Sequence, residues 1–475
     1  GSEGQEDLLV RAADQMDGDS CFVELEMLYF RDGPQVGTFL QKALQSCPTL
    51  RTIRLDGTVL DRVAYEAIVE RMERNALESL KISRHSMDFN SGLLLAEGIA
   101  RCSSLRVLDL EMTHLGDVVA GAILESILKA KALKELNLNS NNISSKSIVP
   151  IVQLVGELGL ERLELENNFR LMENQSLDPR LQKALTENRS LRTLNLNGMS
   201  TPSRQFFTSL MHHPQLEMLK IGRNPLPDTD ANEVDVFLTT NTHLKHLDLS
   251  DNSIGDAGLK AICKGLEKNS TLETLILQGI KAGDNSVVAM KSMLFANRSL
   301  QKLVISDFRD ENGGVGVEGI RAIFEGLIHN TSLRILRLEK GSGTQCTGAP
   351  GWSDQSELLA CVLNTNKSLH ELYFAGRQLE SFGRAVVAEL TEECVIQVLK
   401  FGADEVDNCQ KLRYLTNMNQ VGQMVLRRVP PLSLWPRIFT TKKTNEADAI
   451  FYLLRQNPAL IGQLKPQTSQ QNQKL

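Results

Sequence analysis

Gly314, Gly316 and Gly319 are spaced as in the Gly-x-Gly-x-x-Gly fingerprint with which proteins hold the pyrophosphate of a dinucleotide. Such glycines let the backbone approach phosphate groups at the start of a helix, and here an apolar run, Leu303–Ile305, precedes them. Gly319, however, aligns with Gly258, a turn glycine of a pattern that recurs along the chain, and the motif falls in an enlarged copy of that pattern. We therefore interpret it as a loop and predict no cofactor.

Cysteine and histidine are the other residues that could support metal or nucleophilic chemistry, and the chain has eight of each. There is no Cys-x-x-Cys pair, His212 and His213 are the only close histidines, and no Ser/His/Asp or Cys/His set falls on equivalent strand ends. Cys47 and Cys102 take equivalent places in the recurring pattern, as small buried side chains do. The sequence therefore predicts neither a metal site nor an enzyme, and favours a reducing intracellular environment.

Seven Asn-x-Ser or Asn-x-Thr sequons would fit a glycosylated secreted protein. Five of them precede the strand of the next copy of the pattern, so a recurring turn explains them without a sugar. These five begin at Asn188, Asn269, Asn297, Asn330 and Asn366, and the other two begin at Asn142 and Asn174.

The pattern itself is Leu-x-x-Leu-x-Leu, repeated about every 28 residues, and a fixed period of this length marks a solenoid. Positions 1, 4 and 6 of each repeat are apolar, which predicts a short strand with alternate side chains buried. A second apolar set follows at helical spacing, for example Leu259, Ile262 and Leu266. An asparagine at the ninth position is expected to bond the backbone of neighbouring loops. The repeats begin at Phe22, Leu50, Leu77, Leu105, Leu133, Leu160, Leu191, Leu216, Leu244, Leu272, Leu300, Leu333 and Leu369, with a degenerate copy near Ile396.

The stretch from Leu247 to Leu259, with Leu266, Asn269 and Leu272, resembles the ribonuclease-inhibitor type of leucine-rich repeat. The resemblance extends over about residues 22–400. It implies an α/β solenoid, a horseshoe of about 13 repeats with a parallel β-sheet on its concave face and helices on its convex face. Members of this family mostly bind proteins, as inhibitors, innate-immune sensors, actin regulators or GTPase-activating factors.

The chain carries a net charge of -6, and this charge is unevenly placed. Residues 401–475 hold ten Lys and Arg against five Asp and Glu, so the rest of the chain is strongly acidic. An acidic body argues against a nucleic-acid surface on the repeats. No apolar run reaches the roughly 18 residues of a membrane span, and we expect a cytoplasmic or nuclear protein.

Side chains at the fifth and seventh positions should point out of the concave face, because their neighbours at positions 4 and 6 point inward. In repeats four to six these are mainly acidic: Asp109, Glu111, Glu164 and Glu166, which we call the acidic strip. Glu135 adds to it. A curved wall of one charge favours a partner protein with a basic surface, although a solvated acidic face without a partner has the same sequence.

A second candidate surface lies in repeats ten to thirteen. Ile276, Val304 and Tyr373 place apolar groups on the concave face, with Arg337 among them. Repeats eleven and twelve are longer than the period, with extra residues at 307–317 and 341–356, and the second stretch contains Trp352. An aromatic side chain on such a loop would anchor a partner, whereas loop drift would leave it without a role. Repeat six is also long and is expected to bulge at residues 169–177.

The pattern stops near residue 402, where a solenoid needs a cap over its last apolar layer. We therefore divide the chain into an N-terminal cap at 1–21, the solenoid at 22–402, helical capping at 403–464 and a disordered tail at 465–475. Helices are expected at 411–425 and 445–455, joined by a proline-rich segment at 430–436.

The sequence predicts a scaffold that binds another protein through its concave face and the loop rim of repeats 10–13. Two alternatives stay open. The tail is similar to the SOCS-box docking element of ubiquitin-ligase adaptors, and a GTPase-activating protein would need a catalytic arginine on a rim loop. The sequence leaves the oligomeric state open.

Overall fold

The computed structural model describes residues 23–401, with gaps at 31–32, 169–170, 172–177, 200–202, 225, 307–316, 340–351, 376–379 and 392–393. The chain forms two compact segments, Gly1–Ile276 and Leu277–Leu475, which are described separately. The capping helices and tail expected after residue 402 lie outside the described residues.

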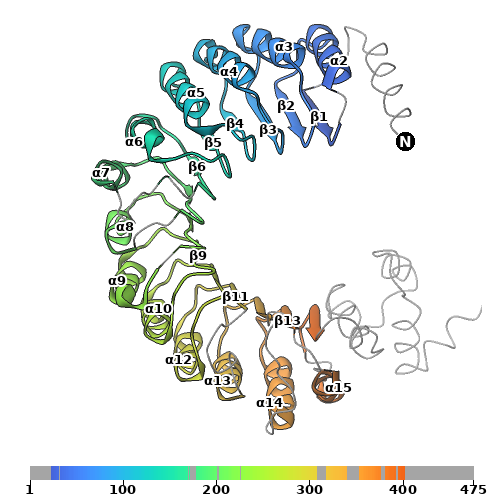
Figure 1. Cartoon of the computed structure of the whole chain (residues 1–475). Coiled ribbons are helices and arrows are strands. Elements are labelled where there is room, and N and C mark those ends of the chain that lie inside the picture. Colours follow the sequence, from blue (N-terminus) through green and yellow to red (C-terminus); the bar gives the residue numbers. More distant parts are fainter. Residues whose placement is uncertain are drawn as a thin grey trace, which may run out of the picture. The chain divides into compact units, whose positions relative to one another are not determined.

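The N-terminal segment contains one short parallel strand in each repeat, and the strands pair in chain order. Figure 1 shows them on the inner side of an arc, with the helices outside. The strands are β1 (Glu24–Leu28), β2 (Thr52–Asp56), β3 (Ser79–Ser83), β4 (Val107–Asp109), β5 (Glu135–Asn137), β6 (Arg162–Glu164), β7 (Thr193–Asn195), β8 (Met218–Lys220), β9 (His246–Asp248) and the start of β10 (Thr274–Gln278).

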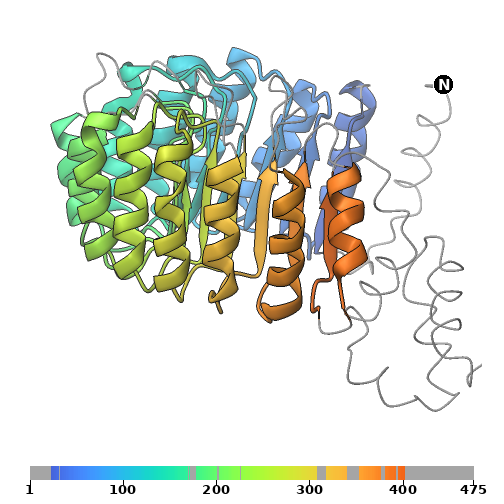
Figure 2. The same ribbon diagram turned by 90° about the horizontal axis from the view of Figure 1, so that it is seen from below.

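One helix follows each strand and returns the chain to the start of the next, as the strand, turn, helix and turn pattern predicts. In Figure 2 the helices run side by side with the strands behind them. The α/β leucine-rich-repeat solenoid fold is therefore confirmed. The helices are α2 (Gly33–Ser46), α3 (Arg62–Glu73), α4 (Phe89–Arg101), α5 (Gly116–Ala130), α6 (Ile148–Glu157), α7 (Pro179–Glu187), α8 (Ser203–Leu210), α9 (Ala231–Thr240) and α10 (Asp256–Lys268), with 3-10 turns at Ser145–Ser147 and Asp228–Asp230.

Leucines at the fourth position form the centre of the core. Leu80, Leu108 and Leu136 stand in register on neighbouring strands, and each is fully buried. The helical set at Leu259, Ile262 and Leu266 covers this layer from the other side and is buried as well. Each such side chain contributes about 1.5–3 kcal/mol by leaving water. A single repeat cannot bury both layers, so the core depends on its neighbours.

Most of the three-residue strands have a side chain at the fifth position that bonds the backbone after the strand. In four repeats an Asp or Asn there accepts a hydrogen bond from the backbone N–H two residues later, and the strand is three residues long. The carboxylate of Asp109, for example, accepts from Glu111 N at 3.1 Å. Strands with Arg54 or Lys81 at that position run for five residues. In these four repeats the local side-chain bond competes with the ladder, but β6 with Glu164 and β8 with Lys220 are equally short, so this bond is not the only cause. The other three short strands of this kind carry Asn137, Asn195 and Asp248.

The ninth-position asparagines form a buried ladder between repeats, as predicted. The side-chain oxygen of Asn168 accepts from Asn141 N and Ile143 N, both at 3.1 Å, and its amide donates to Leu138 O at 3.0 Å and Leu165 O at 2.9 Å. Thr58 donates its hydroxyl to Met27 O at 3.3 Å in the same place. These side chains satisfy backbone groups of loops that lack sheet partners.

The asparagines of the five sequons at helix ends form a second buried ladder of hydrogen bonds between repeats. Asn330 accepts from Ser332 N at 3.0 Å and Leu333 N at 2.7 Å, while its amide donates to Leu294 O at 2.7 Å. The other four have equivalent bonds, and all five are buried. Because the amide nitrogen is engaged inside the fold, the interpretation as a recurring turn is confirmed for these five.

The eighth position, one to three residues after the end of each strand, is left-handed in repeats one to ten, with φ between 53° and 68°. A residue with a Cβ is strained there by roughly 1–2 kcal/mol. Glycine fills the position in only three of these repeats, and larger side chains project from the loop edge in most others. The residues are Tyr29, Gly57, Arg84, Met112, Ser140, Asn167, Gly198, Arg223, Asp251 and Gly279.

At Gly57 this geometry leaves room for a contact between the repeats on either side. The ring of Tyr29 lies against Gly57, and a Cβ built there would stand 2.5 Å from Tyr29 Cδ1. Arg84 then reaches across, donating to the Tyr29 hydroxyl at 2.8 Å and to Asp56 at 3.2 Å. The three repeats are thus joined at the edge where their strands end.

Substitution of Gly57 by alanine is expected to destabilise the protein more than the same change at Gly116. Both glycines have positive φ, 60° and 61°, so both variants carry about 1 kcal/mol or more of backbone strain. Only Gly57→Ala also displaces Tyr29, since nothing lies within 4 Å of a Cβ at Gly116. Urea denaturation of the two variants measures the difference, and Tyr29→Ala in the Gly57→Ala background should remove it. Equal losses would show that the Tyr29 contact adds nothing.

The C-terminal segment repeats the same architecture. Strands β11 to β14 are parallel and paired in chain order, and β14 confirms the degenerate fourteenth repeat. Gly319 takes the third place of its helix, as Gly258 does in α10, so the two are equivalent as predicted, but both lie in helices and not in turns. Gly314 and Gly316 lie outside the described residues. The elements are β11 (Lys302–Ser306), β12 (Ile335–Glu339), β13 (Glu371–Ala375) and β14 (Val398–Phe401), with α11 (Asp284–Val287), α12 (Ala289–Ala296), α13 (Val317–Ile328), α14 (Trp352–Thr365) and α15 (Glu380–Glu389).

Candidate partner-binding surfaces

The acidic strip lies where strands β4 and β6 end, on the inner face of the N-terminal segment. Asp109 and Glu164 are the last residues of their strands, and Glu111 and Glu166 follow two residues later. All four side chains are half-buried, as expected for positions that alternate with buried leucines. The strip therefore faces the concave side, but its members differ in what surrounds them.

Glu164 and Glu166 are held by groups of the protein itself. Glu164 accepts from the amides of Asn139 at 3.2 Å and Asn195 at 3.3 Å. Burial alone would raise the pKa of Glu164, but these two hydrogen bonds, together with the charge of Lys220 and a hydrogen bond from Arg162, outweigh it and the pKa is lowered. Glu166 accepts from Asn195 at 2.9 Å and pairs with Arg223. The negative charges of Glu164 and Glu166 are therefore already compensated by groups of the protein.

The asparagines between these carboxylates are buried, which corrects the prediction that they are surface residues. Asn195 is 1 % exposed and Asn139 and Asn197 are each 7 % exposed. Asn139 also accepts from Glu166 N at 2.7 Å, and Asn197 accepts from Gly222 N at 2.6 Å. Because their hydrogen bonds are made within the sheet, they position the glutamates rather than meet a partner.

Asp109 and Glu111 form the less compensated half of the strip. Burial raises the pKa of Asp109, and burial together with the Asp109 carboxylate raises the pKa of Glu111. Asn137 donates a long hydrogen bond of 3.4 Å to Glu111. Among the described side chains no Lys or Arg forms an ion pair with either carboxylate. Lys81, in register with Asp109, and Arg84 offset the effect of burial only in part, so a basic group of a ligand would stabilise both charges further.

Ile276 belongs to the N-terminal segment, whose boundary falls directly after it. It stands in register with Asp248 on β9 and is half-buried. Val304 and Tyr373 lie in the C-terminal segment. The residues of the predicted apolar cluster therefore belong to two segments, Ile276 to the first and Val304 and Tyr373 to the second.

In the C-terminal segment Arg337 stands between Val304 and Tyr373 in the strand register. Its guanidinium lies over the ring of Tyr373, 4.4 Å from the centroid, and the Tyr373 hydroxyl donates to Glu371 at 3.2 Å. Burial and the Glu371 carboxylate raise the pKa of Tyr373. The arrangement is a stacked arginine and tyrosine pair, not the apolar patch that the sequence suggested, because Arg337 covers the ring.

The loop predicted at residues 341–356 is shorter than expected. Helix α14 begins at Trp352, so this residue opens a helix and is not part of the loop. The Trp352 side chain lies outside the described residues, as do residues 307–316 and 340–351. The expected bulge at 169–177 falls outside them as well, except Leu171, which is buried.

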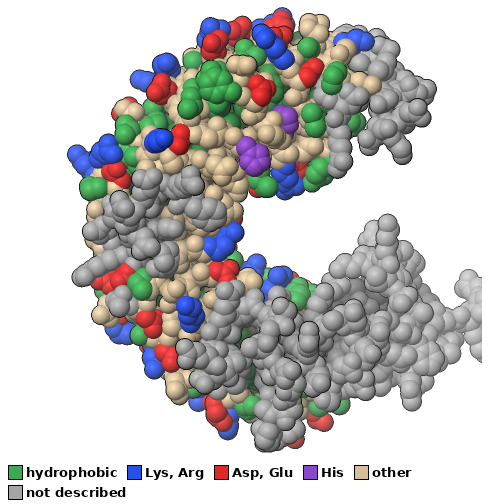
Figure 3. All heavy atoms as spheres, viewed as in Figure 1, with side chains coloured by type: hydrophobic (Ala, Val, Ile, Leu, Met, Phe, Trp, Pro, Cys, Tyr) green, Lys and Arg blue, Asp and Glu red, His purple; other side chains and the backbone are tan. Residues whose placement is uncertain are grey.

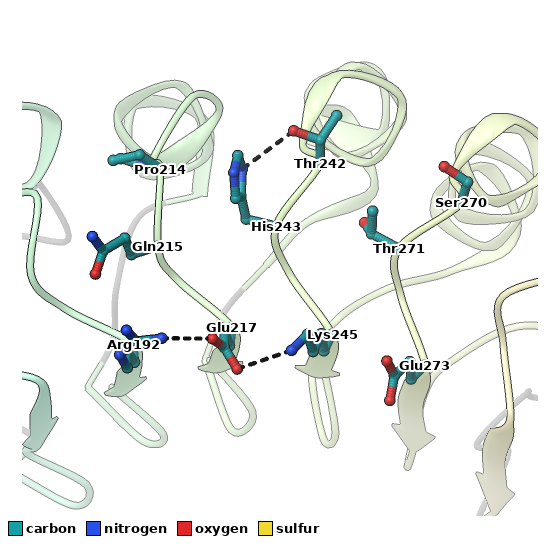
Figure 4. Close-up of a pocket in the computed structure, with 10 residues that line it drawn as sticks. All are labelled: Arg192, Pro214, Gln215, Glu217, Thr242, His243, Lys245, Ser270, Thr271 and Glu273. Atoms are coloured by element: carbon teal, nitrogen blue, oxygen red, sulfur yellow. Dashed lines mark hydrogen bonds and ion pairs between the residues drawn. The ribbon is translucent and has the colours of Figure 1, made fainter.

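A groove of about 570 Å³ at the opposite strand edge was not predicted. It runs past the starts of β7 to β10, and Figure 4 shows Glu217 at its floor between Arg192 and Lys245. Their ion pairs measure 2.8 Å and 3.2 Å. The sequence signal that could have revealed it is the 25-residue spacing after Leu191, the shortest in the chain. Its charges compensate one another, so it offers no marked preference for a ligand.

Metal-binding groups and membrane-spanning helices are two further features that would indicate a function. In the ranges that the structure describes, no group of three or more His, Cys, Asp or Glu could hold a metal ion. Nor does that part of the chain contain a helix that is long and apolar enough to cross a membrane.

Two family models match the chain, and both describe leucine-rich repeats. The TMOD/LMOD leucine-rich domain matches residues 173–312, and a leucine-rich repeat model matches residues 131–152. A search of curated proteins gave no match.

Solved structures with a similar fold are only distantly related in sequence. A chain of the yeast Rad7 and Elc1 complex is 15% identical, with a TM-score of 0.47 over 74% of this chain and 87% of that one. An internalin from Listeria monocytogenes is 14% identical, with a TM-score of 0.39 over 72% and 94%. The actin-binding site 2 of leiomodin-1 is 17% identical, with a TM-score of 0.26 over 38% and 87%.

Proposed function

We propose that this leucine-rich-repeat protein is a scaffold that binds a partner protein with a basic surface through the concave face of its N-terminal segment. The observation that carries the proposal is the pair Asp109 and Glu111. Burial raises the pKa of both carboxylates, and the charges of Lys81 near Asp109 and of Arg84 near Glu111 offset this only in part. A lysine or arginine of a partner placed between them would stabilise the charged forms.

Glu164 and Glu166 have a different part in this proposal. Their side chains are fixed by Asn195 and Arg223, so they supply a rigid negative background. Such a field steers a basic partner and sets its orientation more than it adds affinity. The direct contact is therefore assigned to the first half of the strip.

A second contact is proposed in the C-terminal segment, at Val304, Arg337, Trp352 and Tyr373. Arginine and tyrosine are among the side chains that most often dominate binding energy, and their stacking limits the entropy lost on contact. Arg337 contacts no carboxylate among the described side chains, which leaves its charge available. This surface would engage an acidic or aromatic group of the same partner.

The test is affinity capture from native extract followed by crosslinking mass spectrometry. The double variant Asp109→Asn, Glu111→Gln keeps shape and removes both charges. We expect the amount of captured partner to fall by about tenfold or more, as loss of a desolvated charge contact implies. Glu97→Gln with Glu125→Gln is the matched control, because both lie exposed on α4 and α5.

Crosslinks should map to the inner face around Asp109 and to the region of Tyr373. A captured protein whose crosslinks avoid both places would contradict the proposal. So would capture that persists unchanged in the double variant and in Trp352→Ala with Tyr373→Ala.

A further inference from the structure

Large apolar side chains are exposed at the edge where the first four strands end. Tyr29 is 58 % exposed, Val59 42 %, Phe89 54 %, Met112 43 % and Val118 67 %. We call these five the apolar rim. In Figure 3 hydrophobic and histidine side chains gather on this face of the first repeats. Exposed aromatic and methionine side chains over several consecutive repeats are typical of a protein interface.

Three carboxylates of this edge are engaged within the protein, and the exposed Arg84 pairs with Asp56. Asp61 caps α3 by accepting from Ala64 N at 2.9 Å, and Asp88 caps α4 by accepting from Asn90 N and Ser91 N, both at 3.0 Å. Asp117 accepts from Ser144 N at 2.7 Å. These carboxylates bond backbone N–H groups, so the apolar side chains are the main groups that the edge presents to a partner.

Close packing of α4 and α5 brings part of the rim together. A Cβ at Gly92 would overlap Cγ1 of Val119, so the two helices can approach this closely only with glycine there. Phe89 opens α4, three residues before Gly92, and Val118 precedes Val119 on α5. The contact at Gly92 therefore sets these two exposed side chains on adjacent helix starts.

Met112 joins the rim to the acidic strip. It follows Glu111 directly, in the left-handed eighth position with φ 54°, and its amide donates to Asn139 O at 2.9 Å. The backbone turns here from the concave face to the loop edge. An apolar surface and the carboxylate pair Asp109 and Glu111 therefore border one another within a single repeat.

We infer that the apolar rim and this carboxylate pair together bind an amphipathic basic helix of a partner protein, with its apolar face on Phe89, Met112 and Val118. The inference rests on the proposed function, for which it names the form of the ligand. Charge complementarity selects this occupant, because the carboxylates would repel an acidic helix. Burial of two or three apolar side chains supplies the affinity.

The test uses a fluorescent helical peptide made only of leucine and lysine, with a benzophenone group on its leucine face, and the full chain. Titration by fluorescence anisotropy should give saturable binding, and photo-crosslinks should map to Met112, Phe89 or Val118. Phe89→Ser with Met112→Ser should weaken binding by about tenfold or more. Both side chains are exposed, so the variant should fold, which circular dichroism checks.

Two controls test separately whether binding depends on the apolar rim and whether it depends on the positive charge of the peptide. Val236→Ser with Phe295→Ser removes exposed apolar side chains from α9 and α12, and it should leave binding unchanged. A peptide of leucine and glutamate in the same pattern should bind at least about tenfold more weakly. Equal binding of the two peptides, or equal effects of the two double variants, would overturn the inference.

A second copy of the chain is the competing occupant. Concentration-dependent sedimentation of the wild type that is lost in Phe89→Ser with Met112→Ser would show self-association and overturn the inference. Capture from extract that depends on Asp109 and Glu111, combined with peptide binding that ignores the rim variant, would refute the helix inference and leave the proposed function intact.

Discussion

Replacement of Asn141 by alanine is expected to destabilise the N-terminal segment by about 3 kcal/mol or more, since each buried backbone group left without a partner costs about 1–3 kcal/mol. The side chain is fully buried. Its oxygen accepts from Thr113 N at 3.0 Å and Leu115 N at 3.3 Å, and its amide donates to Leu110 O at 2.6 Å. Alanine leaves these groups unpaired where water does not reach them. Urea denaturation followed by circular dichroism measures the loss.

Two further substitutions show whether the ladder is the cause. Asn141→Thr should lose less than Asn141→Ala, because Thr58 and Thr113 use a hydroxyl at the ninth position of their own repeats. Asn142→Gly should be nearly neutral, because Asn142 is exposed and glycine tolerates its φ of 56°. Hydrogen exchange at residues 113–115 should quicken only in the ladder variants. A loss in Asn142→Gly as large as in Asn141→Ala would contradict this explanation.

The parts of the fold that the sequence predicts are those in which one residue type recurs at one position. Leu108 and Leu136 mark the buried fourth position, and Asn141 and Asn168 mark the ladder. Only an apolar side chain can fill the core, and only an amide or hydroxyl can bond the backbone groups of the loops. Because each position accepts only one kind of side chain, its recurrence in the sequence predicts the structure.

The left-handed conformation of the eighth position could not be predicted, because no single residue type recurs there. Its residues include Tyr29, Arg84 and Asp251, which share neither size nor charge. The common feature is a backbone conformation, and packing of each loop against its neighbours imposes it despite the strain on residues other than glycine. Periodicity of residue type cannot reveal a conformation that many residue types adopt.

The candidate site was predictable only in outline. The acidic residues of the concave face follow from the alternation of a strand, but their compensation does not. Hydrogen bonds, among them one from Asn195 of the next repeat, outweigh the burial of Glu164, whereas at Asp109 burial outweighs the charge of Lys81. The apolar rim was missed because Phe89 and Val118 occupy different places in their repeats. Their proximity comes from how α4 and α5 pack at Gly92.

His213 takes the place of asparagine in the helix-end ladder, where it is 2 % exposed. Its Nδ1 accepts from Leu216 N at 3.1 Å and Gln215 N at 3.3 Å, as Asn188 and Asn241 accept in the flanking repeats. Its Nε2 lies 3.3 Å from the Asn188 side-chain oxygen and donates to it. A proton on Nδ1 would face two N–H donors. The fold therefore requires the neutral ring.

The free energy of unfolding should consequently decrease as the pH falls below about 6.5. Burial, followed by the charges of Arg189 and His243, lowers the pKa of His213 to about 4 from 6.5. Between these values the unfolded chain binds a proton and the folded chain does not, so the free energy of unfolding decreases as pH falls from 6.5 to 4 and is unaffected above 7. At 1.36 kcal/mol per pKa unit the loss at pH 4 is about 3 kcal/mol.

His213→Asn should remove this loss and keep the ladder, because asparagine makes the same bonds in the neighbouring repeats. The unfolding free energies of the variant and the wild type should differ by an amount that grows by about 3 kcal/mol between pH 7 and pH 4, in favour of the variant. His212→Asn, next to it on an exposed site, is the control and should leave the pH dependence unchanged. Urea titrations across this range measure both. A constant difference between wild type and His213→Asn would mean that the ring protonates within the fold, and that its bonds to Leu216 and Gln215 do not hold it neutral.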